Sequence, residues 1–121
     1  MLTIRKEQMQ ALAEDLRRSF RSKLARNLRA DLPQETQSLS EKQLAAIIDE
    51  GLLRAARYQI TTERALFLFV YLMVLHSSRF DEAPDMLWAR KILLRSDLTG
   101  EARMSLIYQT LGARQRQKKP S

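Results

Sequence analysis

The residues of this chain whose types could support chemistry gather in one short segment, residues 76–88. His76 is the only histidine, and three carboxylates and the only tryptophan, Trp88, follow it. A lone histidine without a serine, a cysteine or paired carboxylates at a motif spacing is a poor general base. We therefore expect His76 to be a residue at the edge of the core, hydrogen-bonded to a carbonyl.

The three carboxylates are Asp81, Glu82 and Asp85, and they lack the alternating ligand pattern and the glycine of a calcium loop. With no cysteine in the chain, we predict no metal site, no cofactor and no enzymatic activity. These acids suit the N-terminus of a helix that starts at Pro84. Alternatively, they form an acidic lip for the arginines of a protein partner. Trp88 is then either a core residue or an interface anchor.

A second candidate site is the basic face of the N-terminal segment, where Arg17, Arg18 and Arg21 lie close together in the sequence. The net charge of +7 is uneven: it is +5 over residues 1–30, −2 over residues 31–100 and +4 over the rest. The basic residues of the C-terminal tail are Arg114, Arg116, Lys118 and Lys119.

These basic ends suit a solvated surface, an acidic protein partner or the phosphates of a nucleic acid. Acidic residues interrupt the N-terminal cluster, and its one aromatic residue, Phe20, belongs to the apolar face, so the cluster lacks a series of aromatic residues for base stacking. A protein partner is therefore favoured over nucleic acid. The candidate partner-binding residues from both segments are Arg17, Arg18, Arg21, Asp81, Glu82 and Trp88.

The element that must position these residues is the apolar run from Ala65 to Leu75. Its eleven residues would rise only about 16 Å as a helix, against roughly 30 Å of bilayer hydrocarbon. We therefore predict a buried central helix and no membrane span.

Composition indicates an all-α protein. The 121 residues include only three Gly and three Pro, and 45% of them are hydrophobic. We expect a compact bundle of about five helices forming one domain, residues 1–112, followed by a flexible, disordered basic tail, residues 113–121. The absence of cysteine and of an apolar signal segment favours a cytoplasmic location.

The first helix is expected to run from about Arg5 to Arg29 and to end before Pro33. Its apolar residues recur every four positions, so the apolar face winds around the helix axis. Such a helix either wraps obliquely over a core or contacts different partners along its length. The residues of this face are Leu12, Leu16, Phe20, Leu24 and Leu28, extended by Ile4, Met9 and Ala13.

Local signals predict the other helix ends. Ser40 and Gln43 form a capping box, so a second helix should start at Glu41. Gly51 within that helix indicates close contact with another helix. Further starts are expected at Thr61 or Thr62, at Pro84 and after Thr99, and the last helix should end at Gly112 with Ala102 facing inward.

Three strings of residues resemble a family of small helical bacterial proteins that accompany type VI secretion effectors. The segment from Leu2 to Met9 resembles "hydrophobic-T-I-R-x-E-Q-M", and the segment from Gly51 to Glu63 resembles "G-I-x-R-A-x-x-Y-G-I-x-S-E". The segment from Phe80 to Leu93 resembles "F-D-x-D-P-x-x-P-W-A-x-x-I-L". The chain departs from these patterns at Gln59, where the family has Gly, and at Ala83, Leu87, Arg64 and Ala65.

The resemblance implies a non-enzymatic adaptor or co-chaperone that helps to load an effector onto the secretion spike. Its partner would be the effector, the effector's chaperone or both, and helix surfaces would cover an apolar segment until delivery. The main alternative is a nucleic-acid-binding protein that uses the basic N-terminal helix and the C-terminal tail. A third possibility is an immunity protein that blocks a toxin.

Overall fold

A computed structural model describes the backbone of residues 6–118 and the side chains of residues 6–116. Within that range the chain is all-α, as predicted, and forms no strand. Leu2, Ile4 and Lys119, which figure in the sequence predictions, lie outside the described residues.

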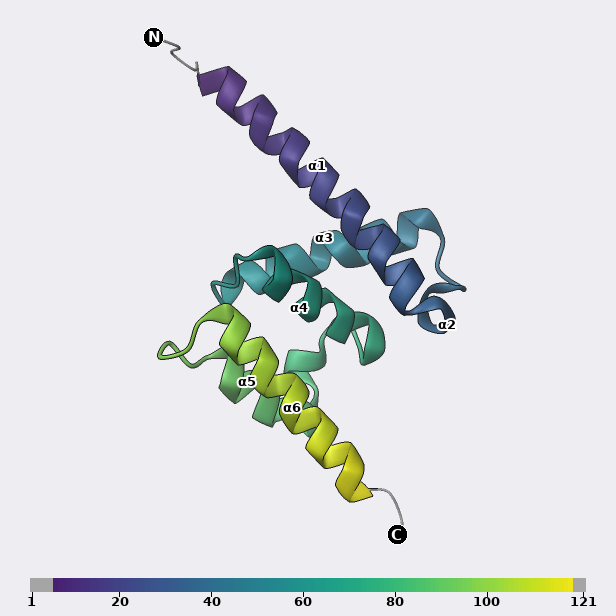
Figure 1. Ribbon diagram of the computed structural model, residues 1–121, viewed down its shortest axis with the longest axis vertical. Helices are drawn as coiled ribbons and strands as arrows, with labels where there is room; N and C mark the ends of the chain where they lie inside the picture. The colour runs from purple at the N-terminus through teal and green to yellow at the C-terminus, as the bar shows by residue number, and fades with distance from the viewer. Residues whose placement is uncertain (1–5, 119–121) are drawn as a thin grey trace. The chain divides into compact units, whose positions relative to one another are not determined.

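Six α-helices and two short 3-10 helices follow one another along the described chain (Figure 1). Their bounds are α1 Lys6–Asp31, α2 Pro33–Thr36, α3 Glu41–Arg57, α4 Glu63–Leu75, η1 Phe80–Glu82, η2 Pro84–Met86, α5 Leu87–Leu93 and α6 Gly100–Lys118. Contacts group them into two compact units, Met1–Ile48 and Asp49–Ser121, with α3 contributing to both. Each unit is described on its own below.

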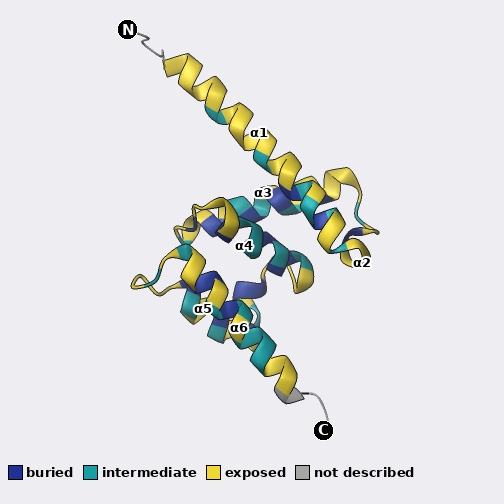
Figure 2. Cartoon of the chain, viewed as in Figure 1, coloured by how far each residue is buried: buried dark blue, intermediate teal, exposed yellow. Residues whose placement is uncertain are grey.

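In the first unit, α1 changes character along its length. Leu24 and Leu28 near its end are fully buried, whereas Leu12 and Leu16 are exposed. Figure 2 shows the N-terminal half of the helix as almost entirely exposed. The apolar residues of α1 are therefore covered only near its end, and the expectation that its two parts contact different partners stays a prediction.

The end of α1 is fixed by its own arginine. Arg29 donates hydrogen bonds to the carbonyl oxygens of Thr36 at 2.5 Å and Leu39 at 2.8 Å. Pro33 follows the end of α1 and also occupies the first position of the short helix α2. A helix does not need the N–H of its first residue, so the missing N–H of proline costs nothing there.

The predicted capping box starts α3. The Ser40 N–H donates to Oε1 of Gln43 at 2.9 Å, and the Gln43 N–H donates to the Ser40 hydroxyl oxygen at 3.1 Å. Gly51 is buried in the same helix, as the close-contact prediction requires. A Cβ at this position would lie 2.7 Å from Val70 Cγ2 and 2.9 Å from Met73 Sδ on α4.

The connection between α3 and α4 contains one residue with a left-handed backbone conformation, Gln59. This residue has a φ of 58°, and it is the only non-glycine residue with a positive φ among those described. A left-handed backbone crowds the Cβ of an L-residue and costs about 1–2 kcal/mol, which glycine avoids. In the string that this segment resembles, the same position is Gly.

We expect Gln59→Gly to raise the free energy of unfolding by roughly 1 kcal/mol, because it removes the steric cost of the left-handed conformation. Urea unfolding followed by circular dichroism measures this change. Gln59→Ala is the matched control and should give no such gain, since alanine keeps the Cβ. Equal stability of the Gly and Ala variants would contradict the explanation.

In the second unit, α4 is the buried apolar helix that the sequence predicts. Thr62 caps it by accepting a hydrogen bond from the Ala65 N–H at 3.3 Å. Five of its residues are buried: Ala65, Phe69, Val70, Leu72 and Met73. The Tyr108 hydroxyl of α6 donates a hydrogen bond to the carbonyl oxygen of Leu68 at 2.7 Å. The rings of Phe69 and Phe80 pack edge to face, with their centroids 5.2 Å apart.

Helical structure starts at Pro84, as predicted, but its first turn is a 3-10 helix and not an α-helix. Two 3-10 turns occupy Phe80–Glu82 and Pro84–Met86, and α5 begins only at Leu87. The acids of this segment therefore do not precede a long helix, and Asp81 has a different role, described below.

The last helix starts as predicted but ends later. The Thr99 hydroxyl oxygen accepts from the Ala102 N–H at 3.1 Å. Ala102 itself is exposed, contrary to its predicted inward position, while Met104 and Ile107 are fully buried. The helix continues through Gly112 to Lys118, so residues 113–118 of the predicted tail are helical.

Candidate functional site

The predicted acidic lip does not form as a unit, because Asp81 is buried. Only 4% of Asp81 is exposed. One carboxylate oxygen accepts a hydrogen bond from the Arg54 guanidinium, and the other accepts one from the Tyr58 hydroxyl at 2.5 Å. Asp81 therefore pairs with an arginine of its own chain and is unavailable to those of a partner. Glu82 stays at the surface, 3.4 Å from Arg79.

Arg54, Tyr58 and Asp81, named here the Asp81 network, join the end of α3 to η1. Arg54 is itself 4% exposed, and Glu50 and Glu82 lie 3.7 Å and 3.6 Å from its guanidinium nitrogens. Burial lowers the pKa of Arg54, but the hydrogen bond and the charge of Asp81 outweigh burial and leave this pKa raised. Burial has the opposite effect on Asp81 and raises its pKa. The hydrogen bonds from Tyr58 and Arg54 outweigh burial, however, and hold the pKa of Asp81 below its usual 3.8.

The network makes the stability of the second unit depend on pH at both extremes. Ionised Asp81 stabilises the fold above pH 3.8, and this contribution is lost as the pH falls through its lower folded-state pKa. Burial and the hydrogen bond to Asp81 raise the pKa of Tyr58 from 10.0 to about 12. The neutral Tyr58 hydroxyl therefore stabilises the fold below pH 10, and its contribution is lost between pH 10 and 12.

We expect Tyr58→Phe to flatten the alkaline part of the pH profile and to lower stability at pH 7. Some alkaline loss should remain, because burial also raises the pKa of Tyr108. Urea midpoints measured from pH 7 to pH 12 for the wild type and the variant make the comparison. Parallel profiles for the two proteins would show that Tyr58 does not have this role.

A second buried cation, Arg103, was missed by the sequence predictions. Its guanidinium donates to the carbonyl oxygens of Tyr58 at 2.8 Å and Leu93 at 2.6 Å. It thus satisfies backbone groups at the ends of α3 and α5. Its spacing of four residues from Ile107 is the available signal, because it places Arg103 on the buried side of α6.

Trp88 and His76 lie at one cleft of the second unit, with a volume of about 610 Å³. Trp88 is half-buried; its ring N–H donates to the carbonyl oxygen of Asp85 at 3.1 Å, and the Arg114 guanidinium lies 4.8 Å from its ring centroid. Nε2 of His76 is 3.7 Å from an Asp85 carboxylate oxygen. His76 is thus beside a carboxylate rather than the expected carbonyl.

The N-terminal arginines lie on one exposed side of α1. With Glu14, Arg17, Arg18 and Arg21 line a hollow of about 190 Å³. Arg18 is also 3.7 Å from Asp15. The structure thus brings the three arginines together on α1, whereas Trp88 belongs to the second unit.

A different side of the same helix carries unpartnered apolar side chains. Met9, Leu12 and Leu16 are exposed by 58%, 56% and 63%. Their spacings of three and four residues place them on one side of the helix, which we call the α1 apolar face. Leu16 and Arg18 project about 200° apart, so this face is largely opposite the arginines.

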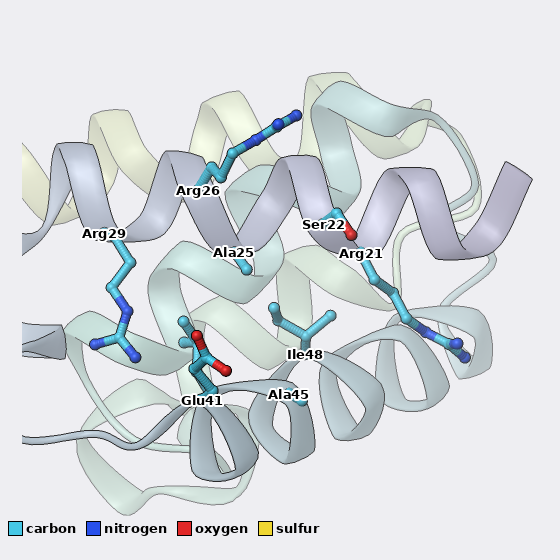
Figure 3. Close-up of a pocket in the computed structure, with 9 residues that line it drawn as sticks. Arg21, Ser22, Ala25, Arg26, Arg29, Glu41, Ala45 and Ile48 are labelled. Carbon is cyan, nitrogen blue, oxygen red and sulfur yellow. The ribbon is translucent and has the colours of Figure 1, made fainter.

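Between α1 and the start of α3 lies a groove of about 380 Å³ within the first unit. Figure 3 shows Ala25 pointing from α1 toward Ile48 of α3, with Arg21 and Arg29 reaching down from α1 on either side. The small residues Ala25 and Ala45 leave the groove open, and the arginines give its edges a positive character. Such a groove can take an apolar side chain that has acidic neighbours.

No helix within residues 6–118 is long and apolar enough to cross a membrane. In the same part of the chain, no group of three His, Cys, Asp or Glu side chains is placed to hold a metal ion.

Comparison with known protein families, curated proteins and solved structures gives no match for this chain.

Proposed function

We propose that this protein is a cytoplasmic, non-enzymatic adaptor or co-chaperone that binds a type VI secretion effector or the effector's chaperone. The observation that carries the proposal is the α1 apolar face, Met9, Leu12 and Leu16. Three large apolar side chains exposed on one side of a helix are typical of a surface that a partner covers. An apolar segment of the effector, packed on this face, would be shielded from water until delivery.

The family resemblance supports the proposal through two structural details. Arg54 and Tyr58 belong to the second resembling string and Asp81 to the third, and the three side chains meet in the Asp81 network. Gln59 occupies the left-handed position at which the family pattern has Gly. Arg54, Tyr58 and Asp81 match the pattern and have a structural reason to occur together, which favours a shared fold. Gln59 departs from the pattern, but its backbone conformation is one that suits Gly.

Co-purification with the products of the neighbouring genes tests the function. We expect the wild type to retain an effector or a chaperone, and Leu12→Glu/Leu16→Glu to lose it by at least tenfold. Both substitutions keep good helix formers on an exposed surface, so the fold should be unchanged by circular dichroism. Leu94→Glu is the matched control, because Leu94 is 62% exposed and belongs to the second unit.

A chain that retains none of its neighbours' products would contradict the proposal. Retention by both the wild type and the double variant would contradict the assignment to the α1 apolar face.

A nucleic-acid-binding protein is the second candidate, favoured by the exposed side of α1 that carries Arg17, Arg18 and Arg21. This function requires that the protein binds DNA or RNA at low salt and that the binding weakens steeply as the salt concentration rises. Replacing the three arginines by alanine should then weaken binding about equally for all sequences. No retention at low salt would dismiss this candidate.

A further inference from the structure

A small cavity in the second unit is lined by the Asp81 network and by three further side chains. Its volume is about 230 Å³, several times the roughly 30 Å³ that one water occupies in the liquid. Three elements line it: the end of α3, the turn η1 and the helix α5. Its lining side chains are Arg54, Arg57, Tyr58, Asp81, Glu82 and Arg90.

The acidic side chains of this cavity already have partners. Each carboxylate oxygen of Asp81 accepts a hydrogen bond, one from Arg54 and one from Tyr58. Glu82 lies 3.6 Å from Arg54 and 3.4 Å from Arg79, so two cations neutralise it. The positive charge of Arg54 is likewise compensated within the network.

Arg57 and Arg90 are different, because neither has a hydrogen-bond, ion-pair or ring partner within residues 6–118. Both are exposed, and they come from different helices to the same cavity. Burial and the hydrogen bond to Asp81 raise the pKa of Tyr58, while the positive charge of Arg90 acts in the opposite direction. The positive charge of Arg90 therefore acts on the Tyr58 hydroxyl, which also lines the cavity.

The cavity is lined by three guanidinium groups and two carboxylates, so its lining carries an excess of one positive charge. Arg57 and Arg90 are the two cations of this lining without a partner within the described residues. Guanidinium groups bind carboxylate and phosphate oxygens through parallel N–H donors, and two of them from different helices can hold one group from both sides. A single exposed arginine would be solvated. Two at one small cavity repel each other, and an anion between them removes that repulsion.

We propose that Arg57 and Arg90 form an oxyanion-binding site, which takes a single phosphate or carboxylate group. Arg57 and Arg90 donate hydrogen bonds to the oxyanion, and the Asp81 network holds the cavity floor in place without contributing to the binding charge. The oxyanion comes either from free phosphate or from an acidic side chain of a protein. This site is separate in sequence from the α1 apolar face and does not depend on the function proposed above.

Titration of the full chain with sodium phosphate and with sodium acetate, each against sodium chloride at equal ionic strength and pH 7, tests the site. The arginine Nε–H signals in ¹H–¹⁵N spectra give the readout. We expect two of these signals to shift saturably, and Arg57→Gln or Arg90→Gln to weaken the affinity at least fivefold. Arg64→Gln is the control, since Arg64 is an exposed arginine of the same unit without a partner within the described residues.

Saturation with phosphate alone identifies free phosphate as the source, and saturation with acetate as well identifies a carboxylate. Shifts equal to those in chloride would overturn the proposal. So would an equal loss of affinity in Arg64→Gln, because it would indicate general charge attraction without a site. Far-UV circular dichroism establishes that each variant is folded.

Discussion

Asp81→Asn is expected to lower the free energy of unfolding by about 3–5 kcal/mol, the largest effect of any single polar substitution proposed here. The amide removes the charge that compensates Arg54, which is 4% exposed. Arg54 then loses its buried, hydrogen-bonded counterion and keeps only the partly exposed Glu50 and Glu82, at 3.7 Å and 3.6 Å, and the Tyr58 hydroxyl loses a charged acceptor. Urea unfolding at pH 7, followed by circular dichroism and Trp88 fluorescence, measures the change.

Asp97→Asn is the matched control for this substitution. Asp97 also pairs with an arginine, Arg95, at 2.6 Å, but both side chains are exposed. An exposed pair of this kind contributes little, so the unfolding midpoint should barely move. Similar losses in the two variants would show that burial of the Asp81 network does not set its energetic role.

Gly51→Leu is the second substitution with a large expected effect, a loss of about 1–3 kcal/mol. Even a Cβ at this position would lie 2.7 Å from Val70 Cγ2, and Val70 is fully buried with a stiff, branched side chain. The longer leucine side chain must separate α3 from α4 or force Met73 aside. Thermal unfolding at a fixed pH measures the loss.

The control for Gly51 is Gly112→Ala in α6. An added Cβ there meets only the flexible end of Arg116, at 3.7 Å. Alanine should therefore stabilise this helix by up to about 1 kcal/mol through its higher helix propensity. A stabilised Gly51→Leu variant would contradict the close packing of α3 on α4.

The helix starts could be predicted from the sequence because their causes are local. Ser40 and Gln43 cap each other across three residues, and Thr62 and Thr99 each cap the next turn. The pairing of Asp81 with Arg54, which lies 27 residues earlier, could not be predicted, because local sequence does not show a distant partner. Local sequence indicated only that the acids lie near a helix start.

The candidate site was predictable in part for a similar reason. Helical spacing alone places Arg17, Arg18 and Arg21 on one side of α1. Spacing also assigns Leu12, Leu16, Leu24 and Leu28 to one apolar stripe that winds around α1, but it cannot show which end of that stripe is covered. Periodicity tells which residues share a side, and only packing tells whether that side is buried.

The same distinction explains why Arg57 and Arg90 were not predicted as a site. They are 33 positions apart, and neither belongs to a sequence motif. Only the fold brings them to one cavity, and only the pairing of Asp81 and Glu82 with other residues leaves them uncompensated.

The most direct test of the proposed function is amide deuterium exchange of the chain, free and in complex with the effector or chaperone that co-purifies with it. If the partner covers the α1 apolar face, exchange should slow in residues 6–20 on binding, and the Leu12→Glu/Leu16→Glu variant should lose this protection. Unchanged exchange throughout α1, with protection only in the second unit, would contradict the assignment of this face as the partner-binding surface.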